Sequence, residues 1–111
     1  MIVPQNATKI TVDYLATVKP RYLNAGYNIP KWIIFSEVML VNGYKVYLWE
    51  SKSTVSKYVF ITKENNTLKI RFSNHKPNKL RELNNDCDIY VGVGHLGVCT
   101  TEQVIEFILN K

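Results

Sequence analysis

Residues 57–73 read KYVFITKENNTLKIRFS, and this stretch decides the fold class. Apolar and polar side chains alternate on both sides of Asn65-Asn66, which is the pattern of two half-buried β-strands. Asparagine tolerates the left-handed backbone of a tight turn, so we expect a hairpin centred there. The register that follows from this turn pairs Thr62 with Lys69, Phe60 with Arg71 and Tyr58 with Ser73.

The predicted hairpin has two different faces, because successive side chains of a strand point to opposite sides of a sheet. One face is apolar and should belong to the core; it carries Val59, Ile61, Leu68, Ile70 and Phe72. The other face combines rings, cations and a hydroxyl: Tyr58, Phe60, Lys69, Arg71 and Ser73, with Lys57 and His75 near its open end. We predict that this second face is accessible and binds a ligand.

Upstream of the hairpin, residues 11–19 read TVDYLATVK and predict a helix. Thr11 is a suitable N-cap, and the apolar residues that follow it have helical spacing: Val12, Leu15 and Val18. Pro20 should end or kink this helix.

A second hairpin is predicted between this helix and the first hairpin. Residues 32–41, WIIFSEVMLV, and residues 44–50, YKVYLWE, are rich in β-branched and aromatic side chains. They flank Asn42-Gly43, a dipeptide typical of hairpin turns because both turn positions need positive φ. We therefore expect two more antiparallel strands here.

Downstream of the first hairpin we expect one strand and one helix. Residues 76–88 are polar and favour a loop with a helical turn, and IYVGV at 89–93 then resumes as a strand. The last stretch, TTEQVIEFILNK at 100–111, has an apolar helical stripe formed by Val104, Ile105, Ile108 and Leu109. Thr100 or Thr101 can cap this helix, and Thr100 with Gln103 fits the spacing of a capping box.

Together these elements predict an α+β fold. It has an N-terminal helix, a mainly antiparallel sheet of four or five strands and a C-terminal helix packed on one face. The length of 111 residues, without repeats or linkers, predicts a single domain over residues 1–111. Without a secretory pattern or a long apolar run, we expect a cytoplasmic protein with no membrane partner. The formal charge of +5 favours anionic partners.

A glycine pattern and a group of cysteine and histidine residues are the candidates for a cofactor or metal site. Gly92, Gly94 and Gly97 spell G-x-G-x-x-G, but no further strand or acidic residue follows as a dinucleotide fold requires. A phosphate contact through the N–H groups of this loop stays open. Cys87, His95 and Cys99 lack the paired spacing of zinc ligands. We therefore predict no metal and no bound cofactor.

A cluster of hydroxyls and cations surrounds the central hairpin. Four hydroxyls fall within six residues, on Ser51, Ser53, Thr54 and Ser56, next to Lys57. The neighbouring strand adds Arg71, Ser73 and His75. Such groups hold phosphate oxygens, arginine through two parallel bonds and lysine as a point charge. The alternative is a polar turn beside a solvated sheet face.

The order S-x-S-T-x-S-x-Y, then R-x-S-x-H, resembles a small domain found in phages and other mobile elements. It is carried by Ser51, Ser53, Thr54, Ser56, Tyr58, Arg71, Ser73 and His75. Asn74 stands where that domain more often has an acidic residue, which weakens a catalytic role for His75. The resemblance implies a phage or prophage origin, the host cytoplasm as the location, and a shared polar site.

Three functions are consistent with these residues. The leading hypothesis is a module that binds nucleic acid or a nucleotide against Tyr58, Phe60, Lys69 and Arg71, which in a phage would fit host takeover or counter-defence. The second is a metal-independent ribonuclease of barnase-like or toxin-like architecture. In it, His75 is the general acid/base, and Glu50 is the nearest candidate for a second one. Arg71 and Lys57 would stabilise the phosphate, and Ser73 would position it. The third is an interaction domain that forms homo-oligomers or binds a host protein.

Overall fold

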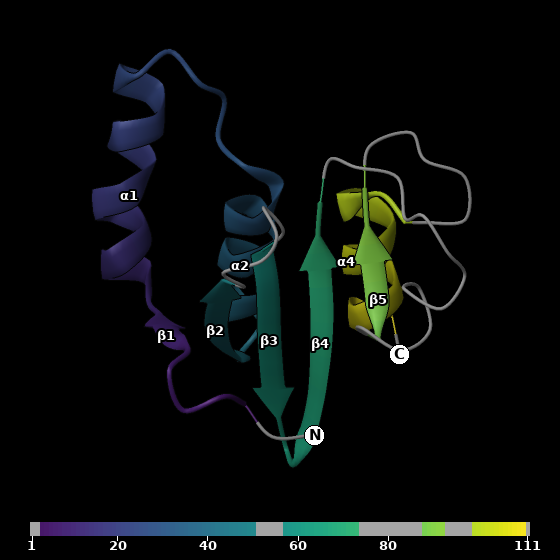
Figure 1. The fold of residues 1–111 in the computed structure, drawn as a ribbon. Coiled ribbons are helices and arrows are strands. Elements are labelled where there is room, and N and C mark those ends of the chain that lie inside the picture. The colour runs from purple at the N-terminus through teal and green to yellow at the C-terminus, as the bar shows by residue number, and fades with distance from the viewer. Residues whose placement is uncertain (1–2, 51–56, 74–87, 93–98, 111) are drawn as a thin grey trace.

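The computed structural model describes residues 3–50, 57–73, 88–92 and 99–110. These residues form three helices and five strands (Figure 1), in the order β1 (Thr8–Ile10), α1 (Val12–Asn24), α2 (Lys31–Val41), β2 (Lys45–Glu50), β3 (Lys57–Lys63), β4 (Asn66–Phe72), β5 (Ile89–Val91) and α4 (Thr101–Leu109). All five strands belong to one sheet, in the order β1-β2-β3-β4-β5. Three neighbouring pairs are antiparallel, and β4 with β5 is parallel. The predicted α+β class is confirmed, with a sheet that is mixed rather than purely antiparallel.

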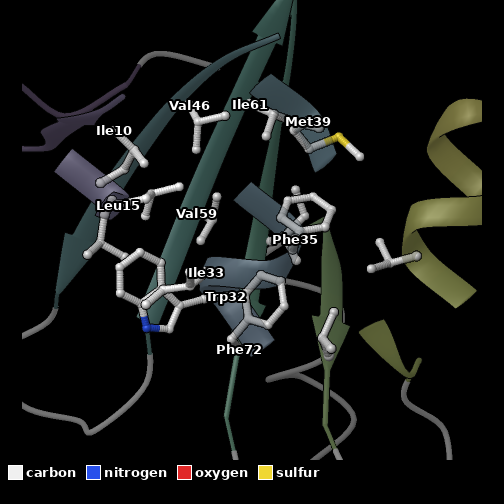
Figure 2. Close-up of a cluster of buried hydrophobic side chains, with 14 of the residues drawn as sticks. Ile10, Leu15, Trp32, Ile33, Phe35, Met39, Val46, Val59, Ile61 and Phe72 are labelled. Carbon is white, nitrogen blue, oxygen red and sulfur yellow. The ribbon is translucent and has the colours of Figure 1, made fainter. Parts of the chain in front are cut away.

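One hydrophobic core lies between a face of the sheet and the helices (Figure 2). The predicted core face of the hairpin is confirmed: Val59, Ile61, Ile70 and Phe72 are buried in the core, and Leu68 packs against it. The helices contribute Leu15, Val18, Trp32, Ile33, Phe35, Met39, Val104 and Ile108. The rings of Phe35 in α2 and Phe72 in β4 lie 5.3 Å apart between centroids. The core therefore fixes α2 against the centre of the sheet.

The N-terminal helix is confirmed, and of the two effects predicted for Pro20, an end or a kink, the end does not occur. The Thr11 hydroxyl accepts a hydrogen bond from the Tyr14 N–H at 3.1 Å, which caps the helix. The helix continues through Pro20 to Asn24. Proline removes a backbone donor and leaves the carbonyl of Ala16 without its helical partner. Ala16 and Pro20 are both exposed, so solvent can satisfy that carbonyl.

The second predicted hairpin is wrong, because its first strand is the helix α2. The buried residues of α2 are Trp32, Ile33, Phe35, Ser36 and Met39, which is a helical spacing. The run is apolar on nearly all sides, so it has no alternation to identify a strand. Its 11 residues are also long for a strand and ordinary for a helix. None of the described helices is long and apolar enough to cross a membrane.

Asn42-Gly43 ends α2 instead of joining two strands. Gly43 has φ of +87°, the left-handed conformation that glycine adopts without steric cost. The Gly43 N–H donates to the Leu40 carbonyl, and the Tyr44 N–H donates to the Met39 carbonyl at 3.0 Å. These two bonds form a Schellman motif. A hairpin turn would need positive φ at both residues, whereas here Asn42 has φ of −93° and only Gly43 is left-handed. Left-handed glycine is common to the hairpin turn and the Schellman motif, which is why the sequence pattern was misleading.

The central hairpin is confirmed with a turn one residue earlier than predicted. Glu64 and Asn65 have φ of 51° and 70°, as the two central residues of a tight hairpin turn do. The observed pairs are Thr62 with Thr67, Phe60 with Lys69 and Tyr58 with Arg71. Each residue of β3 therefore faces a partner two positions earlier than predicted. A shift of two residues keeps every side chain on its expected face.

The C-terminal helix is confirmed together with its capping box. The Thr100 hydroxyl accepts from the Gln103 N–H at 3.1 Å, and the Gln103 side chain accepts from the Thr100 N–H at 2.9 Å. Val104 and Ile108 are buried and Ile105 is half-buried, but Leu109 is exposed. The strand predicted at 89–93 is confirmed over Ile89–Val91.

Candidate anion-binding cleft

A cleft of about 730 Å³ opens at one end of the sheet, on the side of the helices. Figure 1 shows the arrowheads of β4 and β5 and the first turns of α2 and α4 at this same upper end. The strands contribute Lys57, Phe72, Ser73, Val91 and Gly92 to its lining. The helices and the connection between α1 and α2 contribute Tyr22, Tyr27, Asn28, Ile29, Pro30, Lys31, Trp32, Thr100, Thr101 and Glu102. In sheets with parallel strands, the carboxyl ends of those strands are the usual place for a ligand.

Two lysines and one carboxylate give the lining its charge. Lys31 starts α2, and its Nζ lies 3.5 Å from a carboxylate oxygen of Glu102 in α4. Lys57 starts β3, and its Nζ donates to Glu50 at 2.7 Å. Lys31 and Glu102 are exposed, so their pair is weak and can open to admit a ligand. Each lysine of the lining thus has a carboxylate partner in the free protein, Glu102 for Lys31 and Glu50 for Lys57.

The start of α2 offers backbone donors to the cleft. Pro30 occupies the N-cap position and provides no capping side chain, and the first turn contains no acidic residue. The first N–H groups of a helix have no helical acceptor, and the helix dipole makes this end partly positive. Pro30, Lys31 and Trp32 all line the cleft. An anion in the cleft could therefore accept hydrogen bonds from the start of α2.

The start of α4 adds a hydroxyl without a hydrogen bond. Thr101 is 3% exposed and lines the cleft. Within the described part of the chain, its hydroxyl takes part in no hydrogen bond. No fully buried side-chain oxygen or nitrogen in these residues lacks a partner, so the Thr101 hydroxyl retains some exposure. A hydroxyl can both donate and accept a hydrogen bond.

Glu102, at the start of α4, has a lowered pKa. Its carboxylate accepts from its own backbone N–H at the start of α4, and Lys31 stabilises the negative form by its charge. Both causes lower the pKa of Glu102 below its ordinary value of 4.5. Glu102 is therefore an anion at neutral pH.

Aromatic side chains line the remaining part of the cleft. Trp32 is buried, Tyr22 is half-buried against the core, and Tyr27 is 67% exposed. The Tyr27 N–H donates to the Tyr22 carbonyl at 2.9 Å, and the turn between them uses Gly26 with φ of +84°. This turn fixes the backbone of Tyr27 at the mouth of the cleft. The lining of the cleft thus contains aromatic side chains as well as cations and hydrogen-bond donors.

The sheet face that we predicted to be accessible is buried. Side chains form a row across four strands: Trp49 pairs with Tyr58, Tyr58 with Arg71, and Arg71 with Tyr90. The Arg71 guanidinium lies 5.7 Å from the centre of the Tyr58 ring and 4.9 Å from that of Tyr90. Lys69 lies 4.8 Å from the centre of the Tyr58 ring and 5.9 Å from that of Phe60.

The rings of this face and its arginine are almost fully buried. Tyr58 and Phe60 are each 3% exposed, Tyr90 is 4% and Arg71 is 6% exposed. A planar guanidinium loses little hydration when it stacks on aromatic rings, which makes arginine the cation best suited to such a place. The ring faces of Tyr58 and Phe60 are consequently not available for a base to stack on.

The structure divides the predicted site residues between two faces. Lys57 and Ser73 line the cleft, whereas Tyr58, Lys69 and Arg71 belong to the opposite face of the sheet. Ser73 is buried, and its N–H donates to the Val91 carbonyl at 3.1 Å. The remaining predicted residues, Ser51, Ser53, Thr54, Ser56 and His75, lie outside the described residues. A ribonuclease site that needs Lys57 and Arg71 on one phosphate is not favoured by this arrangement.

The glycine pattern begins at the cleft, although Gly94, His95 and Gly97 lie outside the described residues. Its first member, Gly92, lines the cleft and donates its N–H to the Cys99 carbonyl at 3.0 Å. The Cys99 N–H donates in turn to the Tyr90 carbonyl at 3.0 Å. These bonds tie the end of β5 to the start of α4. Among the described residues, no group of histidine, cysteine, aspartate or glutamate side chains gathers as a metal site would.

The sequence matches no protein-family model, and comparison with curated proteins and with solved structures finds no similar chain. The functional argument therefore rests on the geometry of the cleft. Sequence reasoning missed Tyr27 and Lys31, to which no role was given, and Trp32, which was predicted to lie in a strand. It predicted Thr101 as a helix cap alone.

Proposed function

We propose that the protein binds a small phosphate-bearing ligand in the cleft between the starts of α2 and α4. The Thr101 hydroxyl carries this proposal, because it is almost fully buried, makes no hydrogen bond within the described residues, and borders the cleft. Its hydroxyl can donate one hydrogen bond and accept others. A phosphate oxygen at this end of the cleft would accept a hydrogen bond from it.

The neighbouring groups support an anion rather than a cation. The start of α2 presents backbone N–H groups with no capping side chain, and Lys31 and Lys57 stand beside it. Helix N-termini with adjacent lysines are common phosphate sites, since the dipole and the side chain charge act together. Glu102 pairs with Lys31 in the free protein, and the ligand phosphate would take its place there.

A small ligand fits this protein better than a strand of nucleic acid laid on the sheet. Single-strand binding requires rings exposed along an open, positively charged face. Here the rings of the outer face, Tyr58 and Phe60, are each 3% exposed, and Lys69 already lies over both. The cleft, by contrast, has room, hydrogen-bond donors and two lysine side chains.

The test is titration of the ¹⁵N-labelled protein with inorganic phosphate and pyrophosphate, followed by amide chemical shifts. We expect saturable shifts at the amides of Lys31, Trp32 and Thr101. Thr101→Val removes the hydroxyl at nearly constant volume and should weaken phosphate binding about fivefold, the effect of one hydrogen bond. Lys57→Gln should also weaken binding and reduce its dependence on salt.

The control is Thr8→Val, which makes the same change at an exposed position of β1. It should leave phosphate binding unchanged. Shifts that do not saturate, or that spread over exposed lysines such as Lys9 and Lys45 without involving Thr101, would contradict the proposal. Equal binding by wild type and Thr101→Val would contradict it as well.

A further inference from the structure

On the basis of this proposed function, we infer that the ligand is a mononucleotide, with its phosphate at the starts of α2 and α4 and its base stacked on Tyr27. The inference depends on the part of the cleft that a phosphate does not need. Three observations support it: the size of the cleft, its aromatic wall and its charge.

The cleft is much larger than an inorganic anion. Its volume of about 730 Å³ lies within the range of sites for organic ligands and cofactors, roughly 300–1,000 Å³. A phosphate ion at the helix starts would leave most of this space to water. A ligand with a sugar and a base attached to the phosphate would fill it.

One aromatic residue of the lining is largely exposed. Tyr27 lines the cleft and is 67% exposed, so its ring is accessible to a base. Its backbone is held by the bond to the Tyr22 carbonyl and by the Gly26 turn, which limits the entropy lost when a base binds. Asn28, the next residue, also lines the cleft and offers an amide to the edge of a base.

The charge of the lining suits one phosphate group rather than a polyanion. Lys31 and Lys57 supply two positive charges, and their ion-pair partners Glu102 and Glu50 offset both, so no excess charge is present for a polyanion. A chain of phosphates would also meet the Glu102 carboxylate, which repels it. The same carboxylate can accept hydrogen bonds from the hydroxyls of a ribose once the phosphate has taken Lys31. The arrangement therefore favours a nucleoside monophosphate over an oligonucleotide.

The test compares inorganic phosphate, a set of nucleoside 5′-monophosphates and a short single-stranded oligonucleotide, by calorimetry and amide shifts. At least one monophosphate should bind about tenfold or more tightly than inorganic phosphate, the contribution of one stacked base. Tyr27→Ala should remove this advantage and leave the affinity for inorganic phosphate unchanged. Tyr27→Phe keeps the ring and should retain the advantage, and Tyr14→Ala, at an exposed position of α1, is the matched control.

The outcomes separate this inference from the proposed function. If inorganic phosphate binds at Thr101 but no nucleotide binds more tightly, the inference is wrong and the phosphate site stands. If neither phosphate nor any nucleotide perturbs the cleft, both are wrong. Tighter binding of the oligonucleotide than of every monophosphate, with a steep salt dependence, would overturn the inference in favour of nucleic acid.

Discussion

Lys57 and Arg71 lie on adjacent strands, one position out of register, and their side chains point to opposite faces of the sheet. Lys57 pairs with Phe72 and lines the cleft, whereas Arg71 pairs with Tyr58 and stacks on the rings of Tyr58 and Tyr90. The two cations are close along the backbone but cannot act on the same ligand. Their substitution should therefore have different effects.

Replacement of Arg71 by methionine should lower stability and leave anion binding unchanged. Methionine keeps some packing but removes the stacking of a cation on two rings, so we expect a loss of about 1–3 kcal/mol in the free energy of unfolding. Urea denaturation followed by circular dichroism measures this loss. The phosphate affinity of the folded variant should equal that of the wild type; a marked decrease would show that the outer face takes part in binding.

A pair of substitutions in α2 distinguishes the observed helix from the strand that we predicted. Met39 is fully buried and Val41 is 83% exposed, although a strand would place both on one face. Met39→Ala should cost about 2–5 kcal/mol because it leaves a cavity in the core. Val41→Ala should change stability by about 0.5 kcal/mol or less. Similar losses for the two variants in thermal or urea denaturation would be inconsistent with the helix.

The carboxyl of Glu102 should titrate below its ordinary pKa of 4.5, as its backbone contact and Lys31 require. A group with a lowered pKa in the folded state contributes stability above its unfolded pKa, and this contribution disappears as the pH falls through the folded pKa. The effect is thus confined to acidic solution. NMR titration of the side-chain carbon gives the pKa directly, and Lys31→Met should raise it toward 4.5. An unchanged pKa in that variant would mean that Lys31 does not stabilise the carboxylate.

Alternation along the strands predicted the central hairpin well, because a period of two is visible in sequence whenever one face is buried. The turn at Glu64 and Asn65 shifted the pairing by two residues, yet the faces stayed as predicted. The same reasoning failed at residues 32–41, where a helix is apolar on nearly all sides. Asn42-Gly43 then reinforced the error, since a hairpin and a Schellman motif both require a left-handed glycine.

The cleft was less predictable than the fold. Its lining residues come from distant parts of the chain, such as Tyr27, Lys57 and Thr101, so no local spacing reveals it. The sequence correctly predicted which cationic and aromatic side chains share one face of the hairpin. The predicted accessibility of this face was wrong, because Arg71 and Lys69 stack on the rings of their own face rather than leaving them open.

The turn at Glu64 and Asn65 offers a practical handle for work on this protein. It lies at the opposite end of β3 and β4 from the cleft, a separation of about 20 Å for strands of this length. Both residues are exposed. A fluorophore, a spin label or a surface tether attached at Asn65 would leave the cleft free, so immobilised protein could be screened against ligand collections without obstructing the site.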